Sequence, residues 1–257
     1  MPDTDRKASR RMLGAVPESI VVDTEIPRHD GDFAARLLAI PDTASAVADA
    51  LDQFGIGAVI GSRELEPIQD TSRLCGPAVT LRYIPLGGDV TGNRTSGAGM
   101  IFGDRDLYGL AHPGDVGVVD CSQSRTGAVM GALSARWASK AELGGCVIDG
   151  AIRDTASIRN TGLPVWSAVR RPAAARYRYE TVELNGPVAL CGHLVRPGDY
   201  IVADIDGICV IPFAEVPRVV EFCENANRVE VAFIEKIAAA TSLEDLVAGL
   251  GAGTSPA

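Results

Sequence analysis

An arginine and an aspartate stand side by side directly after an apolar run, in the segment GCVIDGAIRD at residues 145–154. A guanidinium can bind a carboxylate through two parallel hydrogen bonds, and a carboxylate is a preferred ligand of hard divalent cations. Gly150 and Ala151 precede the pair, so a ligand or a second backbone segment can approach it closely. Arg153 and Asp154 therefore favour chemistry on a small oxo acid, with an ordinary surface ion pair as the alternative.

Gly131, upstream of the pair, is a second candidate for ligand binding. If a helix begins near this glycine, the backbone N–H groups of Ala132, Leu133 and Ser134 have no acceptor within the helix and point outward at its positive end. Such a helix tip binds carboxylates. The alternative is a helix that only packs between strands, with Gly131 as a point of close contact.

The elements that must position these groups are typical of a mixed α/β chain. Residues 43–54 have apolar side chains at helical spacing, and Gly55 ends the segment. Short strand-like runs follow, including IGAVIG, PAVTLRYIPL, PGDVGVVD and PGDYIVAD. Strands that end in Asp120, Asp149 and Asp204 indicate a sheet with polar residues at its strand ends, where the first two could support the site or cap helices.

Two further segments carry specific expectations. The glycine-rich residues 87–104 contain too many glycines for an ordinary helix, and they lack both the Walker spacing and a lysine, which argues against a nucleotide-phosphate cradle. In residues 121–145, one broad apolar helical face can be formed by Val129, Met130, Leu133, Trp137 and Leu143.

The domain organisation is predicted as a flexible, unpacked polar arm at residues 1–18, one domain at residues 19–250 and a flexible tail at residues 251–257. Near the end of that domain, Ser242 and Asp245 are expected to cap a short helix. Before it runs a long apolar stripe, which could pack on its own domain or meet a second copy, formed by Val216, Val219, Val220, Cys223, Ala226, Phe233, Ile234 and Ile237.

Composition narrows the function further. The 257 residues are 46% hydrophobic, enough for one sizeable core, and the net charge of −9 argues against direct binding to nucleic acid. The partly basic residues 170–180 are interpreted as a solvated loop or strand.

The six cysteines lack C-x-x-C spacing and three histidines stand far apart, so no structural zinc is predicted. No apolar run has the length of a signal peptide or membrane span, and a cytoplasmic protein is expected.

Over residues 43–212 the chain resembles the RraA-like family, which includes 4-hydroxy-4-methyl-2-oxoglutarate aldolases and regulators of ribonuclease E activity. The resemblance lies in TASAVADALDQFG, CGPAVTLR, HPGDVGVVD, the region of Gly131, GGCVIDGAIRDTASIRNTGLPVWS and RPGDYIVADIDGICVIP, in that order. It implies an α/β fold of layered β/β/α type, similar to the swivelling phosphohistidine domain, with C-terminal helices.

The resemblance also implies a site. The turn at Gly131, with the following residues 132–134, holds the carboxylate and carbonyl of a pyruvyl group, while Asp154 anchors Mg²⁺ or Mn²⁺ and Arg153 is the electrostatic partner. In family members the site lies between subunits of a trimer or a pair of trimers, and an acidic residue of the neighbour's C-terminal helix contributes. Glu230 stands at about that place, and Glu235 is a second possibility.

The function implied is that of a class II, metal-dependent carbon–carbon lyase, an aldolase or decarboxylase that cleaves small 2-oxo acids through a pyruvate enolate. No Schiff-base lysine is required, and Lys140 and Lys236 lie in helical, exposed settings that suit one poorly. The alternative is a non-catalytic regulator or protein-binding member of the same family.

Two positions depart from the aldolase pattern. The chain has Ala132 where an acidic residue commonly follows the glycine, and Ser157 where a second acid is expected after the Arg-Asp pair. A lost general acid or base costs on the order of 10² to 10⁴ in rate, so the metal site could outlast the usual aldol reaction. Two alternatives to the usual aldol reaction follow. One is decarboxylation of an oxaloacetate-like acid, and the other is a different substrate whose proton is transferred by Asp89 or Asp104.

Overall fold

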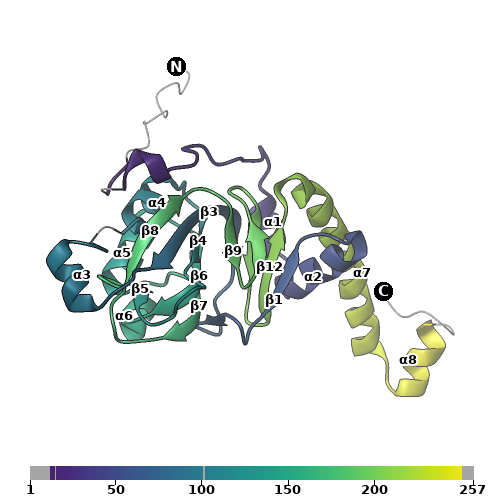
Figure 1. The fold of residues 1–257 in the computed structure, drawn as a ribbon. Coiled ribbons are helices and arrows are strands. Elements are labelled where there is room, and N and C mark those ends of the chain that lie inside the picture. The colour runs from purple at the N-terminus through teal and green to yellow at the C-terminus, as the bar shows by residue number, and fades with distance from the viewer. Residues whose placement is uncertain (1–11, 15, 101, 251–257) are drawn as a thin grey trace.

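A large mixed sheet forms the centre of the protein in a computed structural model that describes residues 12–14, 16–100 and 102–250 (Figure 1). The strands are β1 Ala58–Gly61, β2 Glu66–Pro67, β3 Leu74–Pro85, β4 Val116–Asp120, β5 Ala128–Met130, β6 Gly145–Ile152, β7 Val165–Arg170, β8 Tyr179–Leu184, β9 Val188–Leu190, β10 His193–Val195, β11 Tyr200–Ala203 and β12 Gly207–Ile211. Ten of them share one sheet in the order β1-β12-β11-β3-β4-β6-β7-β2, with β5 beside β6 and β8 beside β3, while β9 and β10 pair separately.

The long strand β3 joins two parts of this sheet that differ in strand direction. Its first residues, 74–77, pair antiparallel with β11, which belongs to the part formed with β12 and β1. Its residues 78–82 pair parallel with β4, which continues in parallel into β6 and β7. Because carboxyl ends of parallel strands meet at one edge, this second part is where a ligand site is expected.

Helices cover the two parts on opposite sides, as Figure 1 shows, with α4 to α6 beside the parallel strands and α1, α2 and α7 beside β1 and β12. The helices are α1 Phe33–Leu38, α2 Thr43–Phe54, α3 Val90–Ser96, α4 Asp104–Leu110, α5 Ala132–Lys140, α6 Thr155–Arg159, α7 Val216–Ala239 and α8 Leu243–Leu250, with 3₁₀ turns at Glu18–Ile20 and Phe213–Glu215. Among the described residues, no helix combines the length and the apolar run that crossing a bilayer requires.

Three buried clusters hold these layers together. One lies between α4, α5 and the parallel strands, a second lies between α1, α2, α7 and the strands β11 and β12, and a third fills the space between the two parts of the sheet around Trp166. This arrangement confirms the predicted layered α/β fold with C-terminal helices. Five of the six cysteines are buried and unpaired, and Cys191 is half-buried, in agreement with their expected role as small apolar side chains.

The local predictions at two helix ends are confirmed. Helix α2 ends at Gly55, whose φ of 64° is the left-handed conformation in which glycine is least strained. At the start of α8 the backbone N–H of Asp245 donates to the Ser242 hydroxyl over 3.1 Å.

The prediction for the glycine-rich residues 87–104 is wrong over α3. Asp89 caps this helix, because its carboxylate accepts hydrogen bonds from the backbone N–H groups of Thr91 and Gly92. The glycines concentrate at the ends of the helix, where Gly88 and Gly97 have positive φ. Local capping therefore outweighs the high glycine content of the stretch.

The predicted apolar face of residues 129–143 is also wrong. Val129 and Met130 belong to strand β5, while Leu133 is 77% exposed and Trp137 is 42% exposed. The face of α5 that meets the core instead consists of small residues, since Ala135 and Ala138 are its buried positions. Small side chains let α5 lie close to the sheet, so its bulky residues face outward.

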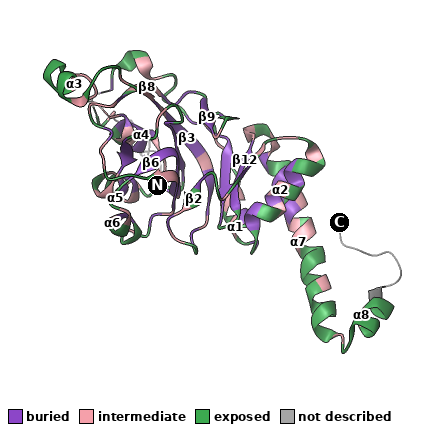
Figure 2. Cartoon of the chain, turned by 60° about the horizontal axis from the view of Figure 1, so that its bottom comes forward, coloured by how far each residue is buried: buried purple, intermediate pink, exposed green. Residues whose placement is uncertain are grey.

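Helix α7 divides into a packed half and an exposed half (Figure 2). Val216, Val219, Val220 and Cys223 are buried against the domain, which agrees with the first part of the predicted stripe. Further along the helix Ile234 is 55% exposed, and α8 continues this exposed end of the chain. The stripe therefore covers its own domain only at its beginning.

The prediction of an unpacked N-terminal arm is wrong for residues 14 and 16, which contact the domain. The backbone N–H groups of Gly14 and Val16 donate to the buried carboxylate of Asp106, over 2.6 and 3.2 Å. Residues 1–11 of the arm and the whole tail, 251–257, lie outside the described residues.

Candidate functional site

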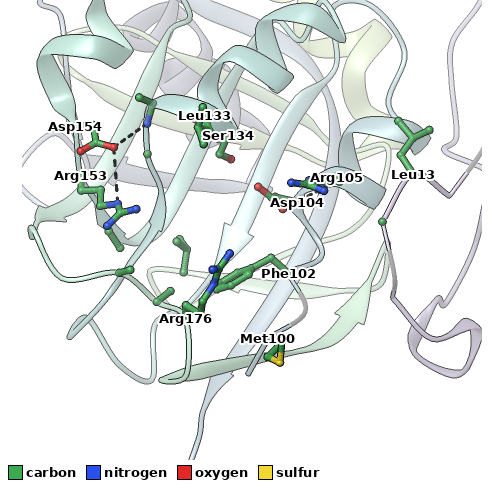
Figure 3. A pocket seen from close by; sticks show the side chains of 17 residues that line it. Leu13, Met100, Phe102, Asp104, Arg105, Leu133, Ser134, Arg153, Asp154 and Arg176 are labelled. Carbon is green, nitrogen blue, oxygen red and sulfur yellow. Dashed lines mark hydrogen bonds and ion pairs between the residues drawn. The ribbon is translucent and has the colours of Figure 1, made fainter. Parts of the chain in front are cut away.

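The candidate site is a cavity of about 800 Å³ beyond the carboxyl ends of β5 and β6 (Figure 3). Four segments far apart in sequence line it. They are the turn from β5 into α5, the turn from β6 into α6, the start of α4 with the residues before it, and the loop at residues 174–176. Leu13 and Gly14 add part of the edge.

The first turn of α5 forms one wall. Gly131 is its N-cap, and the first backbone hydrogen bond of the helix runs from the Ala135 N–H to the Gly131 carbonyl over 3.0 Å. The amides of the three residues between them thus have no acceptor within the helix, and all three residues line the cavity. The predicted helix start at Gly131 is confirmed.

The Arg-Asp pair lies beside this helix tip because β5 and β6 are parallel neighbours. The backbone N–H of Arg153 donates to the Met130 carbonyl over 3.0 Å, which extends the pairing of these strands to their carboxyl ends. Gly131 and Arg153 are therefore held at the same edge of the sheet.

Asp154 turns its side chain back towards α5. Its φ of 55° is the left-handed region, in which aspartate and asparagine are more frequent than other residues with a Cβ. Its Oδ2 accepts a hydrogen bond from the Ala132 N–H at 3.2 Å and lies 3.8 Å from the Arg153 Nε. One of the three amides expected to be free is therefore bound by this carboxylate, and those of Leu133 and Ser134 are left for a ligand.

A side chain at position 131 would disturb this arrangement. A Cβ placed on Gly131 would lie 2.9 Å from the Asp154 Oδ2 and 3.3 Å from the Arg153 Nε, both closer than ordinary contacts. The backbone of Gly131 is extended, with a φ of −145°, so conformation does not require glycine here. The requirement is for space between the helix tip and the Arg-Asp pair.

Asp104 carries the second carboxylate of the described lining and stands across the cavity from Asp154 (Figure 3). It is half-buried, and burial raises the pKa of its carboxyl group, while a hydrogen bond from the Ser134 hydroxyl opposes the shift. The Ser134 Oγ lies 2.7 Å from the Tyr108 hydroxyl, which is buried. A chain of hydroxyls thus connects Asp104 to the protein interior.

The charge of the described lining is opposite in sign to that of the whole chain. Arg105, Arg153 and Arg176 face two carboxylates, those of Asp104 and Asp154, which leaves an excess of one positive charge, whereas the chain carries −9. A positive recess in an acidic protein concentrates small anions. The cavity is therefore suited to a carboxylate ligand.

The structure brings together most of the site residues predicted from sequence. Gly131, residues 132–134, Arg153 and Asp154 all line the one cavity. Glu230 and Glu235 do not, since they lie on the exposed half of α7, and within one chain they stay apart from the cavity. Their suggested role at a neighbouring subunit stays a prediction.

Several residues of the site were not predicted. Met100, Phe102 and Arg105 precede or begin α4, and Arg176 lies in the stretch that was interpreted as a solvated loop. A bridge between Ala128 and Ala174 holds that loop beside β5. The surplus of arginine in residues 170–180 was the signal in the sequence that could have indicated an anion site.

Asp120 and Asp149 do neither of the two things suggested for them, since neither caps a described helix and none of their hydrogen-bond partners lines the cavity. Asp120 accepts hydrogen bonds from Ser122 and from the backbone N–H of Ala189. Asp149 pairs with Arg125 and accepts from the backbone N–H of Cys191. These carboxylates tie the end of β4 and the middle of β6 to the β9 segment. The prediction that a strand ends at Asp149 is wrong, because β6 continues to Ile152.

The described residues contain no group of three or more His, Cys, Asp and Glu side chains that could hold a metal ion alone. This does not conflict with Mg²⁺ or Mn²⁺ at Asp154, because Mg²⁺ is commonly held by one or two carboxylates together with waters and substrate oxygens. The Asp154 side chain is 46% exposed and faces the cavity, so one carboxylate oxygen can bind a cation that the ligand also contacts.

Comparisons with known proteins show which family the chain is similar to. The profile of the RraA-like family, described as Aldolase/RraA, matches residues 44–210. A protein of Halalkalibacterium halodurans named "Putative 4-hydroxy-4-methyl-2-oxoglutarate aldolase" is 30% identical over 190 residues, 74% of this chain and 81% of that protein. Protein DlpA of Legionella pneumophila is 27% identical over 201 residues, which are 78% of this chain and only 31% of DlpA.

Solved structures show the same fold. RraAS2 of Streptomyces coelicolor, described as an unusual member of the RNase ES inhibitor RraA protein family, superposes with a TM-score of 0.66 at 26% identity over 80% of this chain and 97% of that one. An uncharacterized protein of Pseudomonas syringae gives a TM-score of 0.68 at 24% identity, over 83% and 96% of the two chains.

Proposed function

The chain belongs to the RraA-like family, and from this membership and the cavity we propose that it is a divalent-metal-dependent lyase that cleaves a carbon–carbon bond of small 2-oxo acids. One observation carries the proposal. The guanidinium of Arg153, the carboxylate of Asp154 and the amides at the start of α5 face one cavity with an excess of positive charge.

Substrate binding follows from the groups that line the cavity. The carboxylate of the 2-oxo acid accepts hydrogen bonds from the amides of Leu133 and Ser134, at the positive end of α5. Arg153 donates to the same carboxylate or to the neighbouring 2-oxo oxygen. The Ala132 amide holds Asp154 in place, so it orients the carboxylate that anchors the metal.

Bond cleavage leaves an electron pair on the pyruvyl fragment. When the C3–C4 bond breaks, this pair spreads onto the 2-oxo oxygen as an enolate, and Arg153 stabilises the charge that develops there. A Mg²⁺ or Mn²⁺ ion at Asp154 would act as a Lewis acid on the same oxygen. A proton added at C3 then completes pyruvate.

The departures at Ala132 and Ser157 bear on which reaction is retained. Retro-aldol cleavage needs a base that removes the proton of the C4 hydroxyl, whereas decarboxylation releases CO₂ without that step. Both substrates leave the same enolate. The described site therefore suits decarboxylation directly and retro-aldol cleavage once a base is supplied. Oxaloacetate and a 4-hydroxy-2-oxo diacid are accordingly the two substrates to compare.

The assembly proposed for the enzyme is a trimer or hexamer. Glu230 cannot reach the cavity of its own chain, because α7 runs along the opposite side of the molecule (Figure 1). In such an assembly the exposed half of α7 would bring Glu230 of a partner subunit to the cavity.

The direct test is pyruvate release coupled to lactate dehydrogenase, with oxaloacetate and 4-hydroxy-4-methyl-2-oxoglutarate as substrates. We expect release from at least one of them that requires Mg²⁺ or Mn²⁺ and stops with EDTA. A reaction without protein corrects for the spontaneous loss of CO₂ from oxaloacetate. Absent or metal-independent release from both substrates would contradict the proposal.

A second candidate function is favoured by the likeness to RraAS2 at 26% identity together with the two missing acids. A regulator needs no proton-transfer residue and binds a protein partner through its surface. It would show as tight, metal-independent binding to a ribonuclease of the host, together with no pyruvate release.

Gly131→Ala is expected to reduce kcat/KM for pyruvate release about 10- to 100-fold, because its Cβ would displace both Asp154 and Arg153 from their positions. The free energy of unfolding should fall by only about 1 kcal/mol, the cost of alanine at a helix N-cap. Gly87→Ala is the matched control, since a Cβ there meets nothing within 4 Å. Equal kinetics for both variants would argue against a crowded site at Gly131.

A further inference from the structure

Asp104 is held in the cavity by tight packing behind it. It is the first residue of α4, and the N–H of the preceding Gly103 donates to the Thr181 hydroxyl over 3.0 Å. A Cβ on Gly103 would lie 2.6 Å from a methyl group of Leu81. The start of α4 therefore has little freedom to move away from strands β3 and β8, and the Asp104 carboxylate keeps its place in the wall.

The partners of Asp104 suit a group that exchanges protons. The Ser134 hydroxyl favours the charged form of Asp104, and it lies 2.7 Å from the Tyr108 hydroxyl in a contact where either oxygen can be the donor. Arg105 donates its backbone N–H to the Asp104 Oδ1 over 2.9 Å. These contacts orient the carboxylate and leave it at the surface of the cavity.

The other proton-transfer candidates in the described lining are few. That lining contains no His, Cys, Lys, Glu or Tyr, so its two carboxylates are its only side chains of the types that general acid–base catalysis commonly uses. Asp154 is bound to the helix tip and lies beside Arg153. Asp89, the other residue considered as a shuttle, caps α3 and is not part of the lining.

We propose that Asp104 is the proton-transfer residue of this lyase. It takes the place of the acidic residue that the aldolases commonly have at the position of Ala132. The inference rests on the proposed function. In retro-aldol cleavage the Asp104 carboxylate takes the proton of the C4 hydroxyl, the C3–C4 bond breaks, the hydroxyl becomes a carbonyl, and the electron pair stays on the pyruvyl fragment. Asp104 then returns the proton to C3, which gives pyruvate and restores the carboxylate.

The pH dependence has a defined direction. Burial raises the pKa of Asp104, while Ser134 and Arg105 oppose the shift. The buried Tyr83, Tyr108 and Cys146 are further titratable groups that interact with this carboxylate. The base form is needed for retro-aldol cleavage, so kcat/KM should fall as the pH drops through this raised pKa. The acid limb should disappear in Asp104→Asn.

The decisive experiment measures exchange of the pyruvate methyl protons with D₂O by NMR. This exchange reports proton transfer at C3 without cleavage of a carbon–carbon bond. We expect Asp104→Asn to slow both this exchange and retro-aldol cleavage about 100-fold. Decarboxylation of oxaloacetate should fall less than 10-fold, because water can supply the last proton. Binding of oxalate, an analogue of the enolate, should be unchanged. Asp70→Asn, at an exposed carboxylate outside the cavity, is the matched control.

The outcomes separate this inference from the proposed function. Parent-like exchange and cleavage in Asp104→Asn, in a protein that releases pyruvate, would overturn the role of Asp104 and leave the lyase standing. If Glu230→Gln lost exchange and cleavage while Asp104→Asn kept them, the role of Asp104 would also be overturned. The proton transfer would then be assigned to Glu230 of a partner subunit. If Asp104→Asn lost exchange, retro-aldol cleavage and decarboxylation equally, and also lost oxalate binding, Asp104 would have a structural role and the proposal would be overturned. A parent protein without pyruvate release would remove the proposed function, and this inference with it.

Discussion

Asp154→Asn is expected to lower metal-dependent kcat/KM for pyruvate release about 1000-fold, with little change in thermal stability. The substitution removes the negative charge that would anchor the proposed cation and keeps an oxygen that can accept the Ala132 N–H. Asparagine also tolerates the left-handed backbone at this position, where φ is 55°. The loss therefore reports on the charge alone.

The same position offers an informative comparison. Asp154→Ala should lose as much activity and should also cost about 1–2 kcal/mol of unfolding free energy, because alanine is strained in the left-handed region. Steady-state kinetics over a range of Mn²⁺ concentrations, titration calorimetry with Mn²⁺ and oxalate, and melting curves separate the two effects. Parent-level kinetics in Asp154→Asn at limiting Mn²⁺ would exclude Asp154 as the metal anchor.

The side of the site formed by β5 and β6 could be predicted from sequence because it depends on local features. The Arg153-Asp154 pair follows an apolar run that predicts a strand, and Gly131 stands where a helix can begin. Strand β5 before Gly131 was not predicted, since Val129 and Met130 were assigned to a helical face. The resemblance to the RraA-like family added the prediction that Gly131 and the Arg153-Asp154 pair belong to one site. Neither source indicated that Asp154 folds back onto the Ala132 amide, since this depends on a single positive φ.

The opposite wall could not be predicted, because long-range contacts place it. Phe102, Asp104 and Arg105 reach the cavity through the packing of α4 on β3, and Arg176 reaches it through the bridge between Ala128 and Ala174. Periodicity records which face of an element is apolar, and it does not record which distant loop lies opposite. Asp104 was named only as one of two possible shuttles, and the cavity distinguishes it from Asp89.

The error over α5 has a related cause. Periodicity assigned Leu133 and Trp137 to the core because they are large and apolar, yet the helix lies on the sheet through Ala135 and Ala138. Trp137 instead packs its ring against Arg105, whose guanidinium carbon lies 5.1 Å from the ring centroid. The outward-facing side chains thus help to shape the edge of the cavity beside Asp104.

Arg153→Ala is the second substitution with a large expected effect, a fall of about 1000-fold in kcat/KM with a rise in KM. In the proposed function Arg153 binds the substrate carboxylate in the ground state and meets the charge that develops on the 2-oxo oxygen during cleavage, so both binding and the chemical step should suffer. The guanidinium is not committed to Asp154, since the pair is separated by 3.8 Å, beyond hydrogen-bond distance.

Arg153→Lys distinguishes charge from shape. Lysine retains the positive charge and loses the planar fork that matches a carboxylate, so it should recover part of the rate and leave KM raised. Free guanidinium ions added to Arg153→Ala should restore some activity, because the vacated space opens to the cavity, whereas the exposed control Arg63→Ala should behave as the parent. If Arg153→Ala kept the parent KM and kcat, the carboxylate would have to be held by another group, and Arg105 and Arg176 on the other walls would be the next to replace.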